Sequence, residues 1–324
     1  MRAFPKFDAS RIRRSFPPAA GAVLLAVPLF WGGTVAGTAL TGCSKPSPEP
    51  YIHLLHSQQS KEREQAAAKL LLYGDEIVPR LMEEADSEYT RVRFEVVRLL
   101  GRLRNPEAAP ALITALDDKS AMVAAVAAWS LGELQAPQAV EPMLRYAGEA
   151  SREVRKEVIR ALGRCYTDSL EPAVGDSAYR VVFRALRDPT PKVRVNALLG
   201  IRQFGYRGAA EEIIRMTRDP SARVRHVAVQ ALGQLASGKA PRPRPISERT
   251  RENVAEALIA SLEEPMQTIR TKAVRSLEMM GAQKAAPHLR PLAESGTDED
   301  RREAGRVLET LRELKARQPN TGEI

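Results

Sequence analysis

The sequence predicts an all-α protein, a right-handed α-solenoid of about seven helical hairpins with a C-terminal capping helix. Two observations carry this prediction. A pattern of apolar residues returns about every thirty-one residues, and self-similarity at such a period is typical of stacked repeats. Aromatic residues make up only 5% of the chain. The core therefore has to be built from Ala, Leu and Val, which suit thin layers of closely stacked helices.

The repeated pattern is clearest in the segment that begins at Val92. Val96, Leu99 and Leu103 follow it at spacings that place all four on one face of a helix. Gly101 either ends this helix in a left-handed conformation or allows close helix packing. The pattern returns with first positions at Val123, Val154, Val193, Val224 and Ile269. A second helix is expected after each first one, at residues 108–116, 140–147, 178–186, 209–217, 254–262 and 285–293.

This pattern resembles the HEAT-like repeats first associated with phycobilin lyases, over roughly residues 60–315. We expect the solenoid to span residues 51–318 and to be followed by a disordered tail, 319–324. Two copies carry insertions, around residues 166–177 and 237–250. We expect both insertions in turns, because the helices must keep register with their neighbours. The second is basic and rich in proline, and it either contacts an acidic partner or forms a solvated turn.

Two columns of charged residues recur with the repeat. In HEAT-like families an acid and an arginine at such places bridge adjacent turns in a ladder, so the resemblance implies a structural role for both columns. The arginines are Arg63, Arg93, Arg155, Arg194, Arg225, Arg270 and Arg301. The acids, five residues before the first repeat position, are Asp118, Glu149, Asp188, Asp219 and Glu264.

The first forty-two residues have the plan of a secretory signal. Basic residues precede a run, 17–42, that carries no charge. The run ends in Leu40-Thr41-Gly42-Cys43, which resembles the lipobox of bacterial lipoproteins. The resemblance implies that residues 1–42 are a lipoprotein signal peptide and that Cys43 becomes the lipidated N-terminus, which palmitate would label.

Two alternatives remain for this segment. The uncharged run is long enough to be an uncleaved membrane anchor. The basic residues before it would leave the rest of the chain outside the cytoplasm in either case. Residues 13–16, Arg-Arg-Ser-Phe, also resemble a twin-arginine signal, but Pro17 and Pro18 depart from that motif.

The residues after Cys43 are predicted to form a tether. Three prolines in residues 44–50 favour extended backbone, so we assign residues 43–50 to the lipidated cysteine and a Pro-rich spacer.

The formal net charge is +9, of which residues 1–42 hold +4. The remaining +5 is too weak a field for nucleic-acid binding. We therefore expect a membrane-anchored lipoprotein of the cell envelope that faces the periplasm or the exterior.

No catalytic constellation is visible in the sequence. His53 and His56 have helical spacing, but the next acid is Glu62, so we expect no metal. Deoxyhypusine hydroxylase, a metal enzyme on this scaffold, would need His-Glu dipeptides, which are absent here. Two further enzyme classes share this repeat, the HEAT-like DNA glycosylases and the bilin lyases. Export from the cytoplasm argues against both, and the substrates of bilin lyases are cytoplasmic. Cys165 occupies an apolar column and should be buried. We expect no enzyme, no cofactor and no small-molecule substrate.

An apolar patch is predicted where one repeat departs from the pattern. The helix around residues 121–131 has no charge, and Ala124 stands where the other copies carry Arg. Phe94, Ala125 and Trp129 would lie together on the surface away from the core, with an aromatic anchor suited to a partner or a second copy. Alternatively, residues 51–58 or the tether fold back over the patch, or it has no role.

A basic ridge is the second candidate surface. Arg145, Arg184 and Arg215 occupy equivalent places on second helices, and Arg187 and Arg218 lie one turn further on. Stacking would align them into a surface for an acidic partner. Alternatively, Glu141 and Glu211 pair with Arg145 and Arg215 four residues later on the same helices.

These expectations lead to one functional hypothesis. Stacked helix pairs create long surfaces that suit protein partners. We expect a membrane-tethered protein-binding scaffold without catalysis. A structural or assembly lipoprotein is the alternative, and a HEAT-like enzyme such as a lyase is a remote one.

Overall fold

The computed structural model describes residues 46–149, 151–206, 208–239, 241, 243 and 245–317. The signal segment 1–42, Cys43 and the tail 319–324 lie outside the described residues. Residues Ser47–Ile324 form a compact unit. All regular secondary structure in the described residues is helical, as the repeat pattern predicts.

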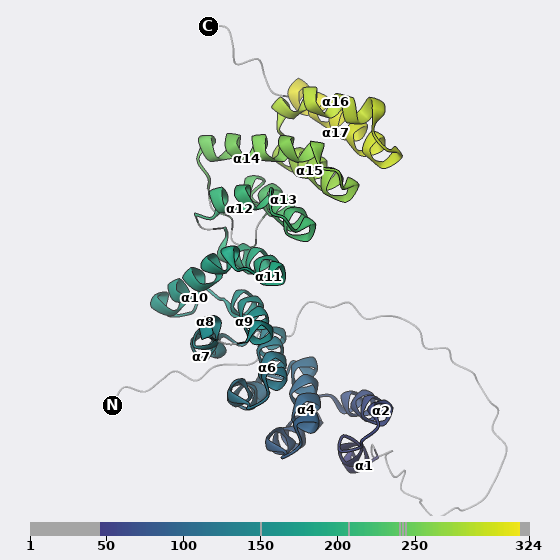
Figure 1. Ribbon diagram of the computed structural model, residues 1–324, viewed down its shortest axis with the longest axis vertical. Helices are drawn as coiled ribbons and strands as arrows, with labels where there is room; N and C mark the ends of the chain where they lie inside the picture. Colours follow the sequence, from purple (N-terminus) through teal and green to yellow (C-terminus); the bar gives the residue numbers. More distant parts are fainter. Residues whose placement is uncertain are drawn as a thin grey trace, which may run out of the picture. The chain divides into compact units, whose positions relative to one another are not determined.

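The first helices of the repeats pack side by side in sequence order (Figure 1). Their faces toward the core carry the predicted apolar positions; Val92, Val96 and Leu99, for example, are fully buried. Hydrophobic burial of this face stabilises each layer. These helices are α2 (Ser60–Leu70), α4 (Thr90–Leu103), α6 (Ala121–Leu134), α9 (Arg152–Cys165), α11 (Pro191–Ile201), α13 (Ala222–Ala236), α15 (Gln267–Met280) and α17 (Asp298–Arg317).

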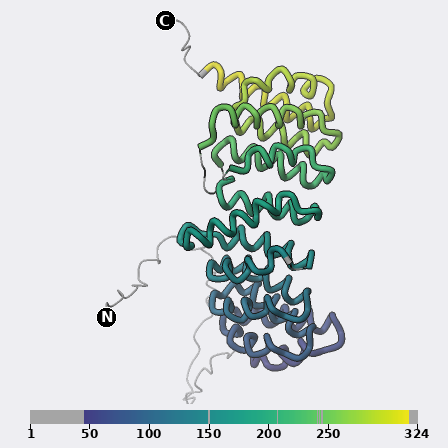
Figure 2. Tube along the Cα trace, turned by 60° about the vertical axis from the view of Figure 1, so that its left-hand side comes forward, coloured from purple at the N-terminus to yellow at the C-terminus, as the bar shows by residue number. Residues whose placement is uncertain are grey.

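The second helices complete the hairpins, which Figure 2 shows as successive layers from purple to yellow. They are α3 (Val78–Glu83), α5 (Ala109–Thr114), α7 (Val140–Leu144) with α8 (Tyr146–Glu149), α10 (Pro172–Arg184), α12 (Ala210–Met216), α14 (Glu248–Ala260) and α16 (Ala286–Ser295). Several continue into a 3-10 turn, at Glu84–Asp86, Ala115–Asp117, Ala185–Arg187 and Ser261–Glu263. The predicted second helices are thus confirmed, and α17 stands alone after the last pair, as expected.

Two segment boundaries differ from the prediction. A short helix, α1 (Glu49–Leu54), begins before residue 51, so the end of the segment 43–50 is helical rather than extended. The first insertion does not lie wholly in a turn, because α10 already begins at Pro172. Residues 172–177 add to the start of α10 and pack there, with Gly175 buried beside Tyr166 and Val174 against the core. The second insertion does form a long connection, between α13 and α14.

The repeated glycines serve close packing rather than helix termination. Gly101, Gly132 and Gly163 lie inside their helices, and the left-handed residues follow three positions later in two of them, at Arg104 and Gln135. A Cβ on Gly163 would stand 2.5 Å from Cα of Gly200 in α11. Contacts of that length do not occur, so glycine sets how closely first helices approach.

The predicted charge ladder is present and connects neighbouring repeats. In the pair Arg194–Asp219, Nε and Nη2 of the arginine donate to the two carboxylate oxygens at 2.8 and 2.7 Å. Nη1 of Arg194 donates at 2.8 Å to the carbonyl oxygen of Asp188, which precedes its own helix. Asp219 also accepts a hydrogen bond from the backbone N–H of Ser221 at 2.8 Å, so this side chain also fixes the backbone turn that precedes α13. Equivalent ion pairs are Arg93–Asp118, Arg155–Asp188 and Arg225–Glu264.

The ladder departs from the sequence prediction at its two ends. Arg63 donates to the carbonyl oxygens of Ser57 and Gln58. Arg270 pairs with Asp300, whose Oδ2 lies 2.6 Å from Nη2, although Asp300 occupies another column of the repeat. Arg301 binds Gly296 O and Asp298 in its own repeat. The side chain of Glu149 lies outside the described residues.

Candidate protein-binding surfaces

The structure brings the predicted apolar residues together. Phe94 of α4 and Ala125 and Trp129 of α6 line one open groove of about 620 Å³, and Met122 extends it. Phe94, Ala125 and Trp129 are half-buried, whereas 64% of Met122 is exposed. Residues 121–131 of α6 carry no charge, so this part of the helix leaves an apolar strip open to a partner.

Residues 51–58 are not among the described residues that line this groove. Ile52 and Leu55 are buried with α1 against α2. His56 Nε2 lies 3.2 Å from Oε2 of Glu84, and its ring packs edge-on against Tyr89. Residues 51–58 therefore cover the first hairpin rather than the apolar strip, so they are not the segment that folds back over it.

The basic ridge is only partly available. Glu212, of which 6% is exposed, binds two of its five arginines. Arg187 donates to the Glu212 carboxylate through Nε at 3.1 Å and Nη2 at 2.6 Å, and Arg215 pairs with the same carboxylate. Hydrogen bonds from Arg187 and the burial of Glu212 act on its pKa in opposite directions, and the arginines prevail, so that this pKa is lowered.

The alternative that Glu211 pairs with Arg215 is wrong: Arg215 forms its ion pair with Glu212, and Glu211 accepts a hydrogen bond from Asn253. Glu212 points inward and reaches the helix of the preceding repeat. Arg145, Arg184 and Arg218 remain exposed, and among the described residues none of them has an ion-pair partner. Arg145 and Arg184 line a groove of about 600 Å³ between the third and fourth hairpins.

Cys165 is fully buried, as predicted, and its Sγ donates to Leu131 O at 3.3 Å. Burial raises the pKa of this thiol to about 12, so it is protonated and unreactive at neutral pH. Within the described ranges, the structure contains no cluster of three or more potential metal-ligating side chains. No helix of the part of the chain that is described is long and apolar enough to cross a membrane.

The architecture defines a class of protein, the helical-repeat solenoids. Within this class, residues 48–122, 109–182 and 179–246 each match HEAT repeats. These matches together cover more than half of the chain, which therefore belongs to the HEAT-repeat family. The sequence matches none of the curated proteins with which it was compared.

The fold is similar to that of several solved structures. The chain is similar to YibA of E. coli, with a TM-score of 0.61 and 20% identity over 82% of this chain and 93% of YibA. It is also similar to an engineered protein, with a TM-score of 0.53 and 20% identity over 82% of this chain and 78% of the other. The complex of CpcE and CpcF of phycocyanin lyase from Nostoc is more distant, with a TM-score of 0.45 and 19% identity over 76% of this chain and 98% of the other. Likenesses at these identities define the fold alone.

Proposed function

We propose that this protein is a protein-binding scaffold of the cell envelope, held to a membrane by a lipid on Cys43, and that it carries out no reaction. The apolar strip formed by Phe94, Met122, Ala125 and Trp129 is the observation that supports binding most directly. Partly exposed aromatic side chains in apolar grooves dominate the energetics of protein interfaces. Apolar side chains that stay open to solvent contribute little to folding, so an open apolar strip supports a role in binding.

The tether supports the proposed location. Ser47, four residues after Cys43, already contacts the folded unit, because Tyr73 Oη donates to Ser47 O at 3.3 Å. A chain of this length spans at most about 14 Å. A lipid on Cys43 would therefore hold the first hairpin close to the membrane surface, with the later hairpins free to meet partners.

The binding proposal is tested with Trp129→Glu in a pull-down from envelope extract. We expect partner capture to fall about tenfold or more, because a buried charge replaces an aromatic anchor. The matched control is Leu199→Glu: Leu199 occupies the equivalent place on α11 and is 47% exposed. Capture that is equal for both variants, with melting unchanged, would remove the strip as an interface. A lower mass of the Trp129→Glu protein in sedimentation would identify the partner as a second copy.

The lipid is tested separately with Cys43→Ala. We expect the variant to accumulate as a precursor and to lose metabolic labelling by palmitate. The control is Cys165→Ala, which leaves the acceptor in place and should be labelled like the wild type. Labelling of Cys43→Ala at the wild-type level would overturn the anchor and leave the binding proposal standing.

A further inference from the structure

The surface around Trp129 consists of equivalent positions from three successive repeats, and we call this set of positions the grid. α4, α6 and α9 pack side by side (Figure 1), and a step of thirty-one residues connects equivalent places on them. Trp129 is the centre of this grid, and its equivalents on the neighbouring helices are both arginines. The three columns are Phe94, Ala125 and Lys156; Arg98, Trp129 and Arg160; and Arg102, Glu133 and Arg164.

One side of Trp129 is apolar and the other is basic. On the apolar side lies the groove with Phe94, Met122 and Ala125. On the basic side, Trp129 lines a second groove of about 590 Å³ together with Arg98, Arg102 and Arg104. The indole is shared by the two grooves, so a ligand that covers it meets apolar surface and guanidinium groups at once.

The arginines on the basic side exceed the carboxylates that balance them. Glu133 lies 2.6 Å from Nη2 of Arg104 and 3.2 Å from Nη2 of Arg164, and 3.7 Å from Arg160. Glu133 is thus shared by three guanidinium groups, of which Arg160 also pairs with Glu157, and Arg98 pairs with Glu95. Arg102 is exposed and has no ion pair with any residue that the structure describes. The surplus of positive charge therefore lies at Arg102, while ion pairs with Glu133 hold Arg104 and Arg164 in place.

The apolar groove is bordered by paired charges instead. Glu153 and Glu157 of α9 line it together with Lys156, whose Nζ lies 3.5 Å from Glu153 and 3.2 Å from Glu157, so the charges at this end balance. An acidic group would be attracted to the other end, where Arg102 has no ion-pair partner among the described residues. The distribution of charge therefore orients a ligand with its acids toward the basic groove.

We propose that this grid binds an acidic peptide segment of a partner protein, with one apolar side chain seated on Phe94 and Trp129 and the adjoining carboxylates on Arg98, Arg102 and Arg104. The proposal deepens the scaffold function and rests on it. Arginine binds carboxylates in bidentate geometry, and the apolar contact with Trp129 supplies the anchor. A nucleic acid fits less well, because it needs a row of unpaired cations, and Arg98 and Arg104 each have an ion pair already, with Glu95 and Glu133.

The test uses the intrinsic fluorescence of Trp129, which is the single tryptophan of the unit Ser47–Ile324. The probe is a short synthetic peptide with a Leu-Phe pair followed by glutamates. Its controls carry lysines in place of the glutamates, or serines in place of Leu-Phe. We expect the acidic peptide to shift the Trp129 emission saturably. Both control peptides should bind about tenfold more weakly, as should the acidic peptide when NaCl is raised from about 50 mM to about 500 mM.

Single substitutions of arginine test the contribution of its charge to peptide binding without a change of fold. Arg102→Glu should weaken the acidic peptide about tenfold, and Arg102→Lys should weaken it less. Arg290→Glu, an exposed arginine of α16, should bind like the wild type. Equal binding of the lysine and glutamate peptides, or wild-type affinity in Arg102→Glu, would overturn the proposal. So would a Trp129 shift with phosphatidylglycerol vesicles and none with the peptide, which would point to a lipid surface. If no peptide binds while capture from envelope extract still depends on Trp129, the grid proposal is wrong and the scaffold function stands.

Discussion

Arg93 and Asp118 belong to different repeats, yet two hydrogen bonds join them, from Nε to Oδ2 at 2.6 Å and from Nη2 to Oδ1 at 3.0 Å. Both side chains are more than nine-tenths buried. Nη1 of Arg93 meanwhile donates to the carbonyl oxygen of Ser87 at 2.8 Å. One guanidinium thus fixes the start of its own helix and the start of the next repeat, so the ladder sets the register between layers.

Removal of the guanidinium should therefore be costly. We expect Arg93→Ala to lower the free energy of unfolding by about 3 kcal/mol, because Asp118 would stay buried without its partner. Urea unfolding followed by circular dichroism measures this loss. Arg102→Ala, an exposed position on the same helix, should change stability by less than about 0.5 kcal/mol. Equal losses in the two variants would show that the ladder adds little.

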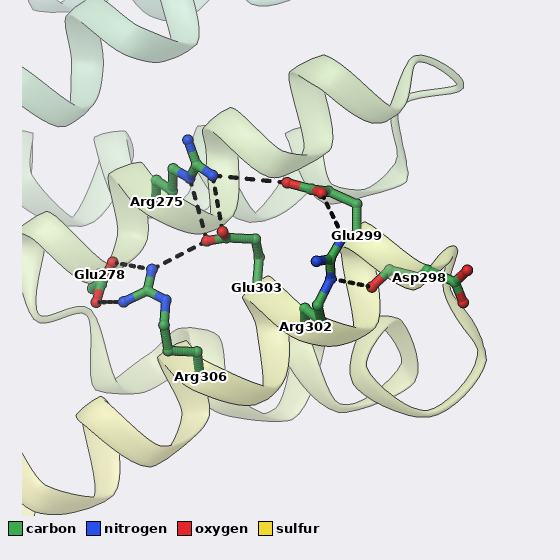
Figure 3. A network of polar contacts seen from close by, with 7 residues as sticks. All are labelled: Arg275, Glu278, Asp298, Glu299, Arg302, Glu303 and Arg306. Carbon is green, nitrogen blue, oxygen red and sulfur yellow. Dashed lines mark hydrogen bonds and ion pairs between the residues drawn. The ribbon is translucent and has the colours of Figure 1, made fainter.

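The ion pairs of the capping helix predict a loss of stability in acid. In the network of Figure 3, Arg275 Nη2 donates to Oε1 of Glu303 at 2.8 Å, and Arg306 Nη2 to Oε2 at 3.1 Å. The Arg275 hydrogen bond, against the opposing effect of burial and with help from Arg306, lowers the pKa of Glu303 from 4.5 to about 2. A carboxylate with a depressed folded pKa contributes stability above its unfolded pKa and loses it as the pH falls through the folded value.

We therefore expect the melting temperature of the wild type to fall more steeply than that of Glu303→Gln between about pH 4.5 and about pH 2. Thermal unfolding by circular dichroism at stepped pH values measures both curves. The control is Glu309→Gln on the same helix, which should follow the wild type, since within the described residues Glu309 has no ion pair. Parallel curves for wild type and Glu303→Gln would contradict a role of the network in acid stability.

The close approach of first helices gives a third prediction. Gly163→Ala should destabilise the protein by about 2 kcal/mol, because the new Cβ would collide with Gly200 and push α9 from α11. Gly305 of α17 has no atom within 4 Å of such a Cβ. Gly305→Ala should raise stability by up to about 1 kcal/mol through helix propensity alone. Urea midpoints measure both, and a tolerated Gly163→Ala would mean that the layers separate easily.

The period of the sequence was sufficient to predict the helix pairs, the buried face and most of the ladder. Equivalent places in stacked repeats have equivalent neighbours, so one spacing determines many contacts. The same step of thirty-one residues from Trp129 reaches Arg98 and Arg160, and it would have revealed the grid. The polarity pattern predicts only the apolar members of the grid, and the arginines join them because α4, α6 and α9 lie side by side.

The repeat period does not predict which of several neighbouring acids forms the ion pair with an arginine. Glu212 and Asp300 are the most deeply buried acids in these ion pairs, with 6% and 1% of each residue exposed, yet neither stands in the predicted acid column. Burial alone would raise the pKa of Asp300, but hydrogen bonds from Arg270 and Thr297 outweigh it and lower this pKa. Which carboxylate turns inward depends on the rotation of its helix against the preceding repeat, and sequence spacing within one helix does not contain that information.

The last prediction concerns α17, which covers the final layer. Val307 and Leu311 are buried against the preceding hairpin, whose own Leu277 and Leu289 are fully buried. A chain that ends at Glu299 would lose about 2 kcal/mol for each of these two apolar side chains and the Arg270–Asp300 pair as well. We expect it to aggregate and to unfold at lower urea concentration, because terminal repeats protect the ends of a solenoid. A chain that ends at Arg317 keeps α17 and should behave as the wild type. A chain ending at Glu299 that sediments as the full-length protein does, with an unchanged urea midpoint, would show that the hairpin of α15 and α16 closes the solenoid by itself.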